Sequence, residues 1–242
     1  MTAIFTKEFN SYLHSLIAYI VISVFLTCIG LLMWVFPETN VLDYGYADMN
    51  VLFSLGPYVM MFLIPAITMK MFAEERKSGT IELLVTRPVS DWEIVLGKYL
   101  AALLLVVFAL VPTILYYYSI YMLGNPAGNI DTPGVIGSYA GFILLGAAFT
   151  SMGLFASAIT ENQVIAFVIA VFMSFLLFEG LGSLAGLFPK GTTTLLIERL
   201  GMVYHYNSLS KGLIDLRDVV YFLSVSGMML MCTKLILGSR KW

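Results

Sequence analysis

Long apolar runs alternate with short polar segments along the whole chain. Six runs are long enough to cross a bilayer, and they cover residues 16–36, 51–71, 94–123, 135–158, 164–187 and 219–237. A hydrocarbon core about 30 Å thick needs about 20 consecutive apolar residues in a helix. The pattern therefore predicts an all-α, polytopic membrane protein, with residues 1–242 forming one domain of six transmembrane helices.

Residues 1–15 predict an amphipathic helix that lies in the membrane interface. Apolar side chains recur on one helical face, whereas Lys7 and Glu8 fall elsewhere; the apolar set is Ile4, Phe5, Phe9, Tyr12 and Leu13. Such a face suits burial at the level of the lipid headgroups. A plain extension of the first span is the alternative that the pattern leaves open.

Prolines and tyrosines add detail to the second and third runs. Pro57 and Pro65 lie within the second run and Pro112 lies within the third. Neighbouring helices can satisfy the carbonyls that a proline frees inside a membrane bundle, so these positions predict kinks rather than helix ends. The third run spans about 45 Å as a helix and ends in an aromatic anchor typical of a membrane interface, made of Tyr116, Tyr117, Tyr118 and Tyr121.

The polar segment 72–93 separates the second and third runs and predicts a short helix outside the bilayer. Ser78 and Gly79 break the preceding helix, Thr80 is a candidate N-cap, and Pro88 stops the new helix. Its apolar face carries Ile81, Leu84 and Val85 at helical spacing. Ser90 and Glu93 then form a predicted capping box that starts the third span.

Two motifs resemble one protein family over nearly the whole chain. The residues EERKSGT of 74–80, followed by ELL, PVSD and GK, resemble the loop between the second and third helices of ABC-2 type transporter permeases. The residues HYNS of 205–208 and GLIDLRDVVYF of 212–222 resemble the segment entering the last helix of permeases associated with bacterial gliding motility.

The resemblance implies a role for the polar segment and for partners. In the family the short helix is a coupling helix that sits in a groove of a cytoplasmic ATPase subunit, which binds ATP and magnesium, and two membrane subunits pair around the transport path. Carried onto this chain, the coupling residues are Glu74, Glu75, Arg76, Gly79, Thr80, Ile81, Glu82, Leu84 and Pro88. The partners implied are an ATPase, a second permease (sibling or self) and the lipid bilayer. The reading that the apolar face packs on the chain's own helices stays open.

Residues 188–218 are amphipathic, and no piece of them is long enough to span. The family places a re-entrant helical hairpin here, between its last two spans and on the periplasmic side. The candidates for a gate on that side are Glu179, His205, Gly212, Asp215, Arg217 and Asp218. Glu179 draws attention because an ionisable group inside a membrane segment is a functional candidate by default. The alternative for Glu179 and His205 is a satisfied structural group.

Composition excludes several classes of protein. The 242 residues are 60% hydrophobic and 12% charged, which no ordinary soluble domain shows, and the net charge of −2 with no basic run argues against nucleic acid as a partner. Cys28 and Cys232 lie in separate apolar runs and suit buried thiols. The sequence contains no phosphate-binding loop and no metal-ligand spacing, so we expect no enzyme activity and no cofactor of its own.

The distribution of basic residues predicts the orientation. With six spans both termini lie on one side, and nine Lys and Arg residues fall on that side against four on the other. Cytoplasmic segments carry the excess of positive charge, so the termini and segment 72–93 are expected in the cytoplasm, in the bacterial inner membrane. A secondary transporter or channel and a membrane scaffold remain as alternative functions.

Overall fold

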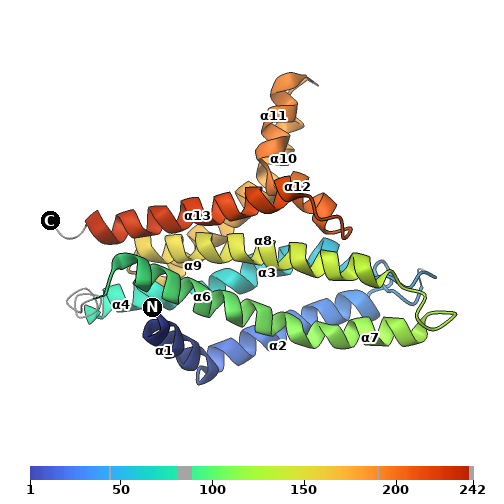
Figure 1. Cartoon of the computed structure of the whole chain (residues 1–242), viewed down its shortest axis with the longest axis horizontal. Helices are drawn as coiled ribbons and strands as arrows, with labels where there is room; N and C mark the ends of the chain where they lie inside the picture. The colour runs from blue at the N-terminus through green and yellow to red at the C-terminus, as the bar shows by residue number, and fades with distance from the viewer. Residues whose placement is uncertain (44, 81–88, 190, 240–242) are drawn as a thin grey trace.

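A computed structural model describes residues 1–43, 45–80, 89–189 and 191–239. The described chain is all-helical, and six of its helical stretches are long and apolar enough to cross a membrane, as predicted. Figure 1 shows these stretches running side by side, with the first and last helices ending toward the same end of the bundle. We call that end the base and the opposite one the far end.

The helices follow the sequence pattern with shifted bounds. They are α1 Thr2–Leu13, α2 Leu16–Trp34, α3 Asn50–Thr68, α4 Lys70–Lys77, α6 Asp91–Leu110, α7 Ile114–Leu123, α8 Thr132–Ile159, α9 Gln163–Phe175, α10 Leu181–Ala185, α11 Thr192–Leu200, α12 Met202–Leu209 and α13 Leu216–Gly238. A 3₁₀ turn, Val111–Thr113, joins α6 to α7, and a π-helical turn, Leu176–Gly180, joins α9 to α10.

The three prolines lie within the spans rather than at their ends, as expected. Pro57 and Pro65 both lie inside α3, and Pro112 lies in the 3₁₀ turn that interrupts the third span. α3 ends at Thr68, and α4 continues it after one residue. The second span therefore reaches beyond its apolar run and carries its charged end, α4, at the base.

Helix α8 is the central element of the bundle because its small residues let other helices approach closely. A Cβ on Gly153 would lie 2.1 Å from Thr68 Oγ1 of α3, and one on Gly141 would lie 2.4 Å from Leu209 Cβ of α12. Gly137 contacts the backbone of Gly212 in the same way. Gly137 and Gly141 thus belong to a packing surface of α8, as small residues in a membrane helix indicate.

The region after the fifth span forms two short helices, as its amphipathic pattern predicts. Tyr206 of α12 is buried and donates a hydrogen bond to the carbonyl oxygen of Phe53 in α3 at 2.8 Å. Burial raises the pKa of Tyr206 far above its usual range, so the phenol stays a neutral donor. In Figure 1, α10 and α11 stand away from the bundle whereas α12 lies along it. A re-entrant hairpin in this region stays a prediction.

We expect Gly153→Ala to destabilise the bundle, because the added methyl group collides with Thr68 in a packed crossing. Overpacking of this kind costs about 1–3 kcal/mol. Gly227→Ala is the matched control, since a Cβ there meets no atom within 4 Å and α13 gains helix propensity. The thermal unfolding midpoint in detergent should fall for the first variant alone; equal midpoints would contradict this packing.

Candidate functional site

A buried ammonium group joins three helices at the base. Lys98 of α6 is 1% exposed, and its Nζ lies 3.0 Å from Glu8 Oε1 of α1 and 2.9 Å from Glu75 Oε1 of α4. Nζ also donates to the carbonyl oxygen of Met71 at 2.8 Å and lies over the Phe72 ring. The charge is thereby paired and its three donors are used, which is the condition for burying a cation. We call Lys98, Glu8 and Glu75 the basal charge cluster.

Glu8 lies on the side of α1 that faces the protein. The sequence pattern places it on the polar side of the helix, and the structure corrects that expectation. Ile4, Glu8 and Tyr12 recur every four residues; a Cβ on Gly97 of α6 would lie 3.0 Å from Ile4, and Tyr12 donates to the carbonyl oxygen of Ile67 at 3.0 Å. Lys7, in contrast, is 62% exposed and lies 3.6 Å from Glu75 Oε1. Helix α1 is thus fastened to α3, α4 and α6 by polar groups as well as by apolar packing.

Tyr12 lies among charged groups of both signs at the base. Burial raises the pKa of Tyr12 well above its usual range, and the carboxylates of Glu8, Glu74 and Glu75 raise it further. The ammonium of Lys70 lies 4.9 Å from the centre of the ring. The phenol therefore remains a neutral donor that holds α1 to α3.

Lys98 is the member of this cluster that sequence reasoning missed as a site residue. In the sequence, Lys98 stands out only as part of the GK pair of the family motif and as one of the basic residues on the cytoplasmic side. A lysine four residues into an apolar run gives a weak signal, because lysines near span ends usually extend to the interface. The signal that could have found it is the pair of acidic residues, Glu8 and Glu75, on the two segments that precede it.

The helices of the cluster flank the predicted coupling segment. Glu75 lies close to the end of α4, where Ser78 caps the helix and Gly79 adopts a φ of +70°. On the other side, the Ser90 hydroxyl accepts from the amide of Glu93, and the Glu93 carboxylate accepts from the amide of Ser90, which confirms the capping box. The Lys98 ammonium therefore links α4, which ends just before residues 78–90, to α6, which begins just after them.

Most of the predicted short helix lies outside the described residues. Ile81, Glu82, Leu84 and Pro88 lie outside the described residues. Thr80 is described, and its hydroxyl lies 2.9 Å from Ser78 Oγ and 3.4 Å from the carbonyl oxygen of Glu75. Thr80 thus contacts the end of α4, and its role as the N-cap of the following helix stays a prediction.

A serine of α8 anchors the junction between α3 and α4. Ser157 Oγ donates to the carbonyl oxygen of Met69 and accepts from the amides of Phe72 and Ala73, at 2.9–3.1 Å. Arg76 donates to the carbonyl oxygen of Ala158. The charged end of the second span is therefore tied to α8 as well as to the basal charge cluster.

A cleft of about 300 Å³ opens beside the basal charge cluster. Residues of α1 and α4 line most of it, with Ser78 and Thr80 at the edge toward segment 81–88. Its lining carries three lysines and three glutamates: Lys7, Lys70, Lys98, Glu8, Glu74 and Glu75. Such balanced charge suits an internal ion-pair network better than a site for a strongly charged ligand.

Two of the gate candidates meet at the far end. His205 Nδ1 lies 2.7 Å from Asp218 Oδ1 of α13, and His205 Nε2 lies 2.9 Å from the carbonyl oxygen of Arg199 in α11. The His205 ring stacks on Tyr221, whose hydroxyl donates to the carbonyl oxygen of Leu200. Both ring nitrogens thus face oxygen atoms of neighbouring helices, and these contacts, which we call the His205 clasp, join α11, α12 and α13.

The structure places the other gate candidates apart from the clasp. Asp215 is the N-cap of α13 and accepts from the amide of Arg217, whose side chain is exposed. Gly212 has a φ of +80°, and a Cβ there would lie 2.3 Å from the carbonyl oxygen of Gly134. Glu179 lies in the π-helical turn and accepts from the hydroxyl of Tyr58 at 3.1 Å.

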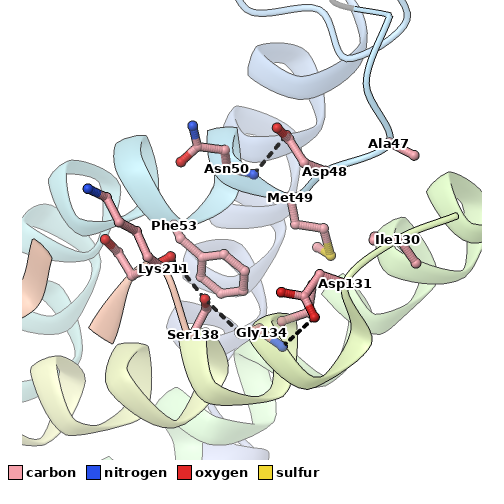
Figure 2. A pocket seen from close by; sticks show the side chains of 12 residues that line it. Ala47, Asp48, Met49, Asn50, Phe53, Ile130, Asp131, Gly134, Ser138 and Lys211 are labelled. Atoms are coloured by element: carbon pink, nitrogen blue, oxygen red, sulfur yellow. Dashed lines mark hydrogen bonds between the residues drawn. The ribbon is translucent and has the colours of Figure 1, made fainter. Parts of the chain in front are cut away.

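A second hollow of about 300 Å³ lies at the far end, between the first residues of α3 and α8 and the loop after α12. Figure 2 shows that its two aspartates are engaged with the backbone: Asp48 accepts from the amide of Asn50, and Asp131 accepts from the amide of Gly134. Ser138 donates to the carbonyl oxygen of Ser210. These groups hold the ends of helices, and no three His, Cys, Asp or Glu side chains of the described residues gather as a metal site.

Comparison with known proteins identifies one family. A family model described as ABC-2 family transporter protein matches residues 37–222, which is more than half of the chain. The match includes α3 to α12, and with them Glu75 and Lys98 of the basal charge cluster. A search among curated proteins gives no match.

We expect Lys98→Met to destabilise the chain, because the largely buried carboxylates of Glu8 and Glu75 then keep only the exposed Lys7 as a nearby cation. Removing one partner of a buried ion pair costs about 3–5 kcal/mol. The triple variant with Glu8→Gln and Glu75→Gln should recover much of that loss, since it removes the uncompensated charge. Lys7→Met is the control, because it removes an exposed ion pair worth about 0–1 kcal/mol. If Lys7→Met and Lys98→Met have the same thermal unfolding midpoint, the role of the cluster is refuted.

Proposed function

The chain belongs to the ABC-2 transporter family, and we propose that it is the permease subunit of an ATP-driven exporter whose hydrolytic site lies on a separate protein. The supporting observation is the basal charge cluster, in which one ammonium holds both helices that flank segment 78–90. A displacement of that segment cannot separate α4 from α6 without breaking a buried ion pair. The segment is thus connected to the bundle as a coupling element requires.

The energy source in this proposal is a cytoplasmic ATPase. The chain has no phosphate-binding loop of the G-x-x-x-x-G-K-[ST] kind, so ATP and magnesium would bind to the partner subunit. Closure of the ATPase would shift the groove that holds residues 80–88. Through α4, α6 and α1, this shift would change the relative stability of two bundle conformations, which is the sense in which ATP drives transport.

Pairing with a second membrane subunit completes the path. The described helices α2, α9 and α13 leave much of their apolar surface uncovered within the chain, and lipid or a second permease would cover it. The resemblance of residues 205–222 to gliding-motility permeases supports a more specific proposal, a sibling subunit of different sequence and a role in moving surface machinery.

The expected location is the bacterial inner membrane, with the base and both termini in the cytoplasm. The nine-to-four distribution of basic residues supports this orientation. In a variant without Cys28 and Cys232, a cysteine at Asn129 should react with an impermeant thiol reagent in intact cells. A cysteine at Ser78 should react only after the cells are opened, and reaction of both from the same side would overturn the topology.

The docking role is tested by replacing Ile81 and Leu84 with Asp. Burial of each apolar side chain against a partner is worth roughly 1.5–3 kcal/mol, and a buried carboxylate costs more. We expect the tagged chain, purified in mild detergent, to lose most of its co-purifying Mg-ATP hydrolysis while keeping its yield and thermal midpoint.

The matched control replaces Leu213 and Ile214 with Asp. These two exposed side chains lie in the loop before α13 at the far end, so hydrolysis should be retained. Loss of folded chain in the Ile81 and Leu84 variant, with hydrolysis per folded chain unchanged, would show that the short helix is a structural cap and that the ATPase docks elsewhere.

A further inference from the structure

Glu179 lies inside the fifth span rather than at its end. It follows Gln163, the first residue of α9, by about 24 Å of helix, and Ala185 closes the span beyond it. Its hydrogen-bond partner, Tyr58, lies about 12 Å along α3 from Asn50. The two side chains therefore meet between the ends of the two apolar stretches that carry them.

A local irregularity positions this carboxylate. Residues Leu176–Gly180 form a π-helical turn, and such turns are frequent at functional sites because they redirect side chains. Phe178, next to Glu179, is buried and packs edge-on against the Tyr58 ring, with centroids 5.7 Å apart. The pair is thus fixed by core packing while the carboxylate stays at the surface of the bundle.

The carboxylate is only partly satisfied. Tyr58 donates to Glu179 Oε2, and among the described residues no hydrogen bond to Oε1 is found. Tyr58 is 41% exposed, so the pair opens outward. An ionised carboxylate facing acyl chains is strongly unfavourable; this part of the surface therefore suits contact with water or with a polar group.

Aromatic side chains continue this surface toward the base. Phe62 follows Tyr58 by one helical turn and is 58% exposed, and Phe175 precedes Glu179 by about one turn and is 49% exposed. A carboxylate beside exposed aromatic faces is the combination that binds organic cations, because ring faces also attract positive charge. A second copy packed directly here would bring two Glu179 carboxylates together, which disfavours a closed protein contact at this point.

We propose that Glu179 and Tyr58 form a binding site for a lipophilic cation on the path between two permease subunits. This inference rests on the proposed function, because the path requires a paired subunit. Glu179 supplies the charge, Tyr58 holds the carboxylate, and Phe62 and Phe175 contact the apolar body of the ligand. Each subunit of this sequence contributes one such site, so the path is selective for positive charge.

The test measures equilibrium binding of radiolabelled tetraphenylphosphonium to the full chain in lipid nanodiscs. Glu179→Gln keeps the shape of the side chain and should weaken binding roughly tenfold or more, because it removes the opposite charge. Tyr58→Phe should weaken it by a smaller factor. Asp43→Asn, which removes one acidic charge from the exposed loop before α3, is the matched control and should bind as the unaltered chain does.

Tetraphenylborate, an anion of the same shape, separates charge recognition from partitioning into lipid. Its association should not differ between the unaltered chain and Glu179→Gln. The proposal is overturned if the unaltered chain and Glu179→Gln bind tetraphenylphosphonium equally well. It is also overturned if Asp43→Asn loses as much tetraphenylphosphonium binding as Glu179→Gln. Co-purifying Mg-ATP hydrolysis, measured on the same variants, reports on the proposed permease function, so that failure of the cation site is distinguishable from failure of the ATPase coupling.

Discussion

The base of the molecule depends on the neutralisation of one buried ammonium. Lys98 can be 1% exposed only because Glu8 and Glu75 approach from two other helices and the carbonyl oxygen of Met71 accepts a third bond. Each carboxylate fixes the helix that bears it relative to α6. The positions of α1 and α4, and of the chain entering and leaving segment 78–90, follow from this requirement.

The far end is held together by a different kind of interaction. There, an aromatic cluster runs from Tyr139 through Phe53, Phe142, Tyr206 and Phe178 to Tyr58, with neighbouring centroids 5.1–6.5 Å apart. Through Tyr206, the cluster packs α12 against α3, α8 and the fifth span. The base is thus held by ion pairs, whereas the part of the bundle toward the far end is held by aromatic packing together with the contact between His205 and Asp218.

Hydropathy predicts the six spans well because each apolar run is long and is interrupted by few charges. Local rules likewise predict the Ser90 capping box, the break at Gly79 and the kink at Pro112, since each depends on neighbouring residues alone. The role of Lys98 depends on residues 90 and 23 positions away, and the inward direction of Glu8 depends on that lysine. The π-helical turn at Glu179 has no recognised signature in residue type. Features made by distant partners are therefore the ones that a single sequence leaves open.

The unequal burial of the spans divides the bundle into a fixed frame and adjustable sides. In an 18-residue stretch of α8, 78% of the residues are buried within the chain, and Gly153 lies directly against Thr68 of α3; the corresponding share is 22% for α2 and 22% for the fifth span. A rearrangement that separated α8 from α3 would open voids along a close-packed crossing. Sliding or rotation of α2 and α9 exchanges one apolar environment for another at little cost. Alternation between two states would thus proceed by rearrangement of the outer helices around a spine that keeps its shape.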